Sequence, residues 1–277
     1  RCVVTCATIV RTLGLMSDAP TERRALLVNS TVAAVLGAGL MVLAHELSHL
    51  VAGLAMGIPG TLYSYGVAHE GSPVQNAIMA GAGPMFSLLT GLVMALWQPL
   101  RATRSFWHLL WLWFAYSSMM EGIGYLEITP FGAGDTAAVA SHLGWPPAVG
   151  WVLLAGGIAG QFALAWGFAH PVGRMAGADR GARLDATLWP WLLGTVVNLG
   201  LSGLSMATHR AALSPGEVTV ILAAGSATLV FAPMAMIFQR KMNAQPYEPL
   251  KLKPIPVVGL ALLAGLILLN QALNLGV

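Results

Sequence analysis

The chain has 277 residues, of which 56% are hydrophobic and only 9% are charged, and its formal net charge is +3. A soluble domain carries about 25% charged residues, so this composition excludes an ordinary soluble protein. It also excludes a disordered chain, which needs low hydrophobicity and high charge. The basic residues are scattered in short clusters and form no face for nucleic acid, so no nucleic-acid partner is expected. The composition predicts a polytopic membrane protein whose surroundings are the lipid bilayer.

Apolar windows long enough to cross a bilayer recur along the whole chain. A helix needs about 20 mostly apolar residues to span the hydrocarbon core. The windows lie at roughly 32–56, 76–98, 105–126, 147–169, 186–207, 217–239 and 255–275. Prolines and arginines separate most of them. We therefore predict an all-α polytopic membrane protein with about seven transmembrane helices.

The distribution of basic residues agrees with this division. With seven spans, the N-terminus and every second loop share one side of the membrane. Thirteen of the fourteen basic residues then lie on that side, and Arg210 alone lies on the other. Because cytoplasmic loops carry an excess of Lys and Arg, we expect a cytoplasmic N-terminus and a C-terminus on the opposite side of a bacterial inner (cytoplasmic) membrane. The apolar but short run 1–16 is interpreted as an interfacial segment.

The first window contains an H-E-x-x-H motif, His45-Glu46-Leu47-Ser48-His49. Residues four apart lie on one face of a helix, so His45 and His49 can bind one metal ion while Glu46 reaches a metal-bound water. Zn²⁺ is the usual metal for two histidines and a carboxylate with an open fourth position. The alternative is a pair of histidines bonded only within the bundle, which is costly inside a membrane.

Three acids in or after the third window could supply a third ligand, namely Glu121, Glu127 and Asp135. The first and third windows run in the same direction across the membrane, so these acids reach the level of the two histidines. The residues alone leave all three acids open. Glu121 is equally well explained as a structural acid bonded within the bundle.

Two further segments of the chain follow the H-E-x-x-H motif, and their order matters for the interpretation. They read Ala82-Gly83-Pro84-Met85-Phe86-Ser87 and Thr129-Pro130-Phe131-Gly132-Ala133-Gly134-Asp135-Thr136. This order resembles the site-2 protease family of intramembrane zinc metalloproteases, with its A-G-P-x-x-N and N-x-x-P-x-x-x-x-D-G stretches. The resemblance covers roughly residues 30–140 and implies a three-helix metalloprotease-like core. It also implies that Asp135 is the third zinc ligand, because the step from Pro130 to Asp135 is kept.

The chain departs from the family pattern at three positions. Ser87 and Glu127 stand where the family often has asparagine, and Thr136 replaces a glycine. The resemblance implies that the asparagines help to hold the substrate or the catalytic centre. Ser87, Glu127 and Glu121 are therefore candidates for supporting the ligands or binding substrate. The family site usually lies toward the cytoplasm, whereas the charge distribution puts this one toward the opposite face.

Residues 61–67, between the first two windows, are rich in β-forming residues. The resemblance implies a short membrane-dipping β element here, which can pair with an unwound substrate by strand addition. An aromatic interfacial loop is the alternative. Tyr63, Tyr65 and the nearby His69 are candidates for substrate binding.

The chain is divided into an N-terminal cytoplasmic or interfacial segment (1–31), a metalloprotease-like transmembrane core (32–140) and a C-terminal bundle of four transmembrane helices (141–277). The expected function is zinc-dependent hydrolysis of a peptide bond in a membrane-embedded protein, such as a single-span helix, with Glu46 as general base. One alternative is a catalytically inactive scaffold or subunit that binds partner subunits in a larger membrane complex. A second alternative is a metal-ion transporter.

Overall fold

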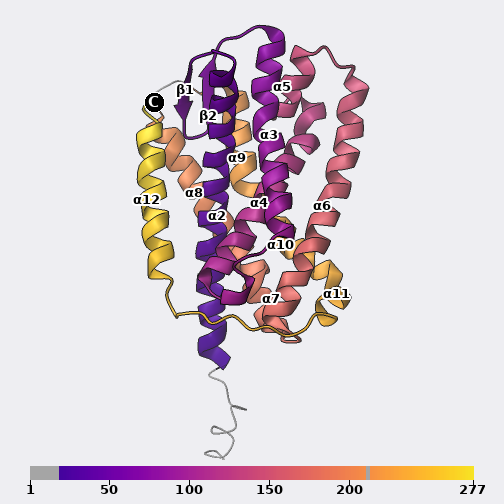
Figure 1. Ribbon diagram of the computed structural model, residues 1–277, viewed down its shortest axis with the longest axis vertical. Helices are drawn as coiled ribbons and strands as arrows, with labels where there is room; N and C mark the ends of the chain where they lie inside the picture. Colours follow the sequence, from indigo (N-terminus) through magenta and orange to yellow (C-terminus); the bar gives the residue numbers. More distant parts are fainter. Residues whose placement is uncertain (1–18, 210–212) are drawn as a thin grey trace, which may run out of the picture.

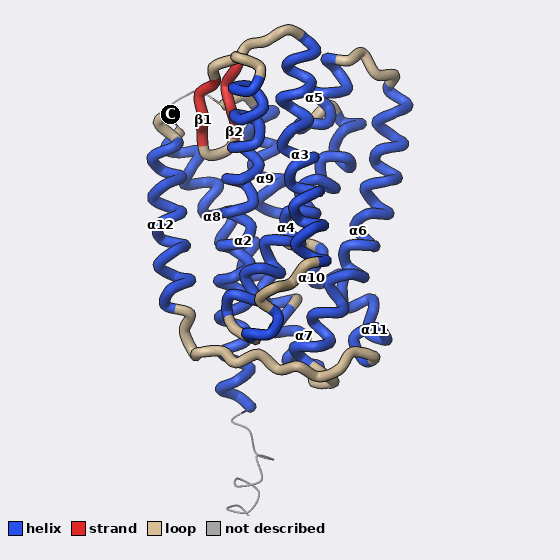
Figure 2. Tube along the Cα trace, in the orientation of Figure 1, coloured by secondary structure: helices blue, strands red, loops and turns tan. Residues whose placement is uncertain are grey.

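The computed structural model describes residues 19–209 and 213–277, so the expected interfacial segment 1–16 lies outside the described residues. A bundle of long helices carries a small β hairpin at one end (Figures 1 and 2). The longer elements are α2 (Ala19–Ala55), β1 (Gly60–Tyr63), β2 (Gly66–His69), α3 (Pro73–Leu96), α4 (Phe106–Ile128), α5 (Gly134–His142), α6 (Pro147–Ala176), α7 (Arg180–Ala186), α8 (Leu188–Thr208), α9 (Pro215–Ala227) and α12 (Val257–Leu273). Shorter pieces are α10 (Phe231–Met234), α11 (Gln239–Asn243) and three 3₁₀ turns, η1 (Arg101–Thr103), η2 (Thr129–Phe131) and η3 (Ala235–Phe238).

Five helical stretches within the described residues are long and apolar enough to cross a membrane. They are Thr21–Ala55, Pro73–Leu96, Pro147–Ala176, Arg180–Thr208 and Pro215–Asn243. The chain is thus an integral membrane protein of the all-α class. The other two predicted windows correspond to α4 and to α12, which has 17 residues. Most of α4 is buried among other helices, so its surface does not have to match lipid, and the count of seven spans stays a prediction.

The first helix starts earlier than its apolar window indicates. It begins at Ala19 instead of near residue 32, so much of the segment 1–31 belongs to this helix. Tertiary contacts hold its first turns. Arg23 pairs with Asp185 at 2.7 Å, and the buried Asn29 amide donates to the Lys253 carbonyl at 2.8 Å.

The sixth window is broken into several helical pieces. Its first piece, α9, ends at Ala227, and the chain continues through α10, η3 and α11. Pro233 lies in α10, has no N–H and clashes with the carbonyl four residues earlier, that of Leu229, which lies in the turn between α9 and α10. The break lies close to this proline, although a proline alone does not predict where a membrane helix breaks.

The last connection crosses the end of the bundle opposite the hairpin, from α11 to α12 (Figure 2). Glu248 anchors it by accepting two hydrogen bonds from the Arg101 guanidinium, at 2.6 and 3.0 Å. This guanidinium lowers the pKa of the Glu248 carboxyl. The pair is largely exposed, so its contribution to stability is small, and its main effect is to fix the path of the connection.

Helices α2, α3 and α4 pack against one another and form the centre that carries the site. Glycines allow α3 and α4 to approach closely, as in many membrane bundles. A methyl group at Gly91 would lie 2.6 Å from the Ala115 carbonyl oxygen and 2.7 Å from the Met119 nitrogen. Both atoms belong to the backbone of α4, which cannot move aside without separating the helices.

We expect Gly91→Ala to destabilise the bundle by about 1–3 kcal/mol, the usual range for overpacking. The measurement is the thermal unfolding midpoint in detergent. The matched control is Gly156→Ala in α6, because a methyl group there would have nothing within 4 Å. Equal midpoints for the two variants would contradict the close packing of α3 on α4.

The hairpin follows α2 directly and pairs its strands in antiparallel register, with Leu62 opposite Val67 and Gly60 opposite His69. Its tight turn, Ser64-Tyr65, is fixed by side chains near the end of α8 and after α12. Buried Ser64 contacts Ser205 of α8 at 2.8 Å and also donates to the side chain of Asn274. The expectation of a short β element is confirmed in this form.

Candidate metal centre

Two histidines and a glutamate project from the last third of α2, at the hairpin end of the bundle (Figure 1). His45 and His49 are one helical turn apart, so their side chains lie on the same face. Both histidines and Glu46 are buried, with 1%, 6% and 7% of their surface exposed. The packing of α2 against α3 and α4 therefore removes all three side chains from lipid and bulk solvent.

Asp135 reaches the histidines through the turn between α4 and α5. Pro130 lies in the 3₁₀ turn after α4, and both Gly132 and Gly134 adopt left-handed backbone angles, with φ of 72° and 77°. Glycine tolerates this conformation without a steric penalty. The chain thus turns back after α4, α5 packs against α3, and Asp135 lies in the first turn of α5, where the helix dipole favours a carboxylate.

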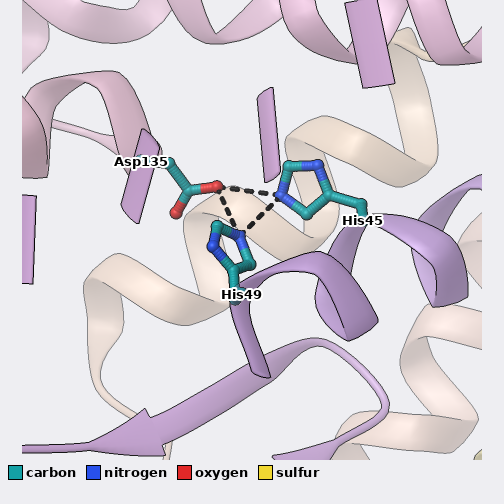
Figure 3. Close-up of side chains that lie close together, drawn as sticks. All are labelled: His45, His49 and Asp135. Carbon is teal, nitrogen blue, oxygen red and sulfur yellow. Dashed lines mark hydrogen bonds and ion pairs between the residues drawn. The ribbon is translucent and has the colours of Figure 1, made fainter. Parts of the chain in front are cut away.

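The ligand atoms of these residues converge (Figure 3). Nε2 of His45 lies 3.0 Å from Nε2 of His49, and the Asp135 Oδ2 atom lies 2.9 Å from the first and 3.1 Å from the second. Of the three acids considered from the sequence, Asp135 is the one that joins the histidines within the described residues.

The opposite ring nitrogens of the histidines have their own partners. His49 Nδ1 lies 2.6 Å from the Met79 carbonyl oxygen, which can only accept, so Nδ1 carries the proton and donates. His45 Nδ1 lies 3.2 Å from the Ser87 hydroxyl. When His45 Nδ1 likewise donates to this hydroxyl, both Nε2 atoms and the carboxylate oxygen are acceptors that face one another. Such an arrangement is repulsive unless a cation or additional protons lie between them.

The group fits a metal ion. Bonds of about 2.0–2.1 Å in a tetrahedral site separate neighbouring ligand atoms by roughly 3.3 Å, close to the observed 2.9–3.1 Å. Partners that orient the second nitrogen of each histidine are typical of metal sites. Gly83 of α3 lies directly behind the histidines, and a methyl group there would be 2.5 Å from Nε2 of His45. His45, His49 and Asp135 could therefore hold a metal ion.

An open cavity of about 570 Å³ adjoins this group. Its polar lining includes Glu46, His49, Tyr65, His69, Asn76, Asp135, His142 and Glu217. Burial lowers the pKa of His69, which favours the neutral imidazole at the cavity surface. The carboxyl of Glu46 thus shares a cavity with the candidate metal ligands without being one of them.

The hairpin presents one strand edge to this cavity. On the outer edge, Leu62 exchanges two backbone hydrogen bonds with Val277, at 2.6 and 3.0 Å. The backbone groups of Leu62 therefore point away from β2, and in an antiparallel pair those of its partner Val67 point to the opposite edge. The same holds two residues later for His69. Val67 and His69 both line the cavity.

The other residues that the sequence suggested for ligand support or substrate binding do not all lie at the metal centre. Ser87 supports His45, as described above, and Tyr65 lines the cavity with its hydroxyl 3.4 Å from that of Ser202. Tyr63 instead packs against His209, with ring centroids 4.8 Å apart. Glu121 and Glu127 line a different, mainly apolar cavity between α4 and α9.

Three contributors were not identified from the sequence as parts of the site. They are the Met79 carbonyl, which accepts from His49, the backbone of Gly83, which lies against both imidazoles, and the ring of Tyr125, which stacks on His45. Gly83 lies in the A-G-P segment, which marks its helix but not its closeness to the histidines. Comparison with protein-family models, curated proteins and solved structures found no match for the chain.

Proposed function

We propose that the chain is an intramembrane zinc metalloprotease that hydrolyses a peptide bond in a membrane-embedded protein. The observation that carries this proposal is the convergence of His45, His49 and Asp135 beside a cavity that also contains Glu46. The motif order that resembles the site-2 protease family supports it. The packed helices α2, α3 and α4 would then be the metalloprotease-like core.

Zinc is the metal that suits two imidazoles and one carboxylate with a fourth position open. When bound, it supplies a Lewis acid and lowers the pKa of the attacking water toward ~7. The residues of the chain hold the ligand set in place. Ser87 and the Met79 carbonyl orient the imidazoles.

Glu46 is the proposed general base. It directly follows a ligand in α2 and lines the same cavity, so its carboxylate can take a proton from water that attacks the scissile carbonyl. The same carboxyl can then return the proton to the leaving amine.

The proposed substrate is a single-span helix that unwinds locally before cleavage. A peptide bond inside a helix is shielded, whereas an extended segment can pair with a strand edge. The cavity edge of β2 offers backbone groups of Val67 and His69 for this pairing. The opposite edge of the hairpin is engaged by Val277, so substrate would approach from the cavity side.

The proposed topology keeps seven spans in a bacterial inner membrane. The basic residues of α7, α11 and the connection 244–256 belong to the end of the bundle opposite the hairpin (Figure 1). By the positive-inside rule that end faces the cytoplasm. The metal centre then lies toward the outer face.

We expect the purified protein to contain one zinc ion per chain, and His45→Ala and Asp135→Ala to lose it, because each removes one of three ligands. Metal content is measured by mass spectrometry of the purified variants. Glu127→Ala is the matched control and keeps its zinc, since Glu127 lines another cavity. Zinc lost with His45→Ala but kept with Asp135→Ala would contradict the ligand set.

Cleavage is tested in liposomes that contain the protein and a panel of single-span helices with glycine-weakened centres. Wild type is expected to release fragments that mass spectrometry can identify, and His45→Ala none. A zinc-loaded wild type that cleaves no member of the panel would support a scaffold or subunit in a larger membrane complex instead. Zinc flux into sealed liposomes would support a transporter.

A further inference from the structure

The ring of Tyr125 contacts two parts of the metal centre that are far apart in the sequence. It stacks on the imidazole of His45, with ring centroids 5.3 Å apart and an angle of 15° between the planes. It also contacts the turn before Asp135, where a methyl group at Gly134 would lie only 2.5 Å from Tyr125 Cδ1. One buried ring thus fixes the plane of one ligand and the path of the chain leading to another.

The same residue borders two cavities. Tyr125 lines the metal cavity and also the apolar cavity that contains Glu121 and Glu127. Glu121 lies one helical turn before Tyr125 on the same face of α4. Tyr125 is thus common to the cavity of the metal ligands and to the cavity of a buried acid that could compete as a ligand.

We propose that Tyr125 is a positioning residue of the metal centre, which holds His45 and the Asp135 turn in register and keeps Glu121 out of the ligand set. The proposal rests on the metal-binding part of the proposed function and not on proteolysis. It assigns the effect to the flat face of the ring, because the contacts with His45 and Gly134 involve ring carbons and not the hydroxyl.

The test is zinc affinity, measured by competition with a chelator in detergent-solubilised protein. Tyr125→Leu is expected to weaken zinc binding about 10- to 100-fold, the range typical of residues that orient metal ligands. Tyr125→Phe keeps the ring and is expected to retain wild-type affinity. Tyr125→Met serves as a second ringless variant of similar length should the leucine variant not fold.

Tyr116→Leu is the matched control. Tyr116 is also a buried tyrosine of α4, but it packs on Phe168 and Phe231, and nine residues of helix place it about 13 Å away along the axis. Its loss is expected to lower the unfolding midpoint without changing zinc affinity. The visible absorption of the cobalt-substituted protein is a second readout, and it should change for the ringless Tyr125 variants alone.

Wild-type affinity in a folded ringless variant would overturn the proposal, as would equal loss of affinity in Tyr116→Leu. A wild type that binds zinc but cleaves nothing would overturn the peptidase function and leave the role of Tyr125 standing. If the wild type cleaves peptides and Tyr125→Leu keeps wild-type zinc affinity, the peptidase function stands and the proposed role of Tyr125 is wrong.

Discussion

Replacing Glu46 with glutamine is expected to lower the rate of peptide cleavage by about 10²- to 10⁴-fold while zinc content stays at one ion per chain. This range is typical for the loss of a general base. Glutamine has nearly the same shape as glutamate but cannot accept the proton. Zinc is expected to stay because the group that could hold it consists of His45, His49 and Asp135 and does not include Glu46. The measurements are initial cleavage rates in liposomes and metal content of the same preparations.

Glu217→Gln is the matched control for this variant. Glu217 lines the same cavity but lies in the first turn of α9, where it caps the helix with Ser214. Glutamine also serves in such a capping box, so the control removes a negative charge from the cavity without loss of structure. Undiminished cleavage by Glu46→Gln, or equal loss in both variants, would remove Glu46 from the role of base.

The local part of the site can be predicted from the sequence. His45, Glu46 and His49 lie within one turn of one helix, so their relation follows from helical geometry alone. Asp135 is 86 residues beyond His49, and the residues themselves left Glu121 and Glu127 equally open. Only the order of motifs selected it. The closeness of Asp135 to the histidines depends on how α5 packs against α3, after left-handed turns at Gly132 and Gly134.

Other contributors leave no distinctive signal in the sequence. Any residue at position 79 offers the same carbonyl, so the partner of His49 Nδ1 becomes visible only when α3 is packed on α2. Tyr125 is one aromatic residue among many in apolar helices. Its importance arises from contacts with His45 and Gly134, which lie in other elements.

For the fold, the sequence predicts where the helices lie but not where each one begins and ends. Apolar windows locate helices because crossing a bilayer demands length and hydrophobicity. They do not locate helix ends that depend on tertiary contacts. Arg23 and Asn29 hold the part of α2 before its window to Asp185 and to the Lys253 carbonyl. Pro233 is visible in the sequence, yet a proline inside a membrane helix is often tolerated, so the break after α9 did not follow from it.

Replacing Gly83 with alanine is expected to weaken zinc binding by more than about 100-fold, beyond the range for residues that only orient ligands. A methyl group at this position would lie 2.5 Å from Nε2 of His45 and 2.5 Å from Cε1 of His49. It would thus occupy space next to the ligand atoms themselves. Each imidazole would have to turn away, which breaks its hydrogen bond to Ser87 or to the Met79 carbonyl.

The control for this variant is Gly81→Ala in the same helix, where the nearest atom to a methyl group would be Val139 Cγ2 at 3.6 Å, an ordinary contact. Both variants replace glycine with alanine inside α3, so the gain in helix propensity is the same for each. Chelator competition should therefore separate the two by zinc affinity, while Gly81→Ala behaves as wild type. Because Gly83 contributes no ligand atom, stoichiometric zinc in Gly83→Ala would mean that the metal does not lie between His45, His49 and Asp135. Loss of zinc in Gly83→Ala alone would instead locate the ion at that point of the bundle, against the backbone of α3.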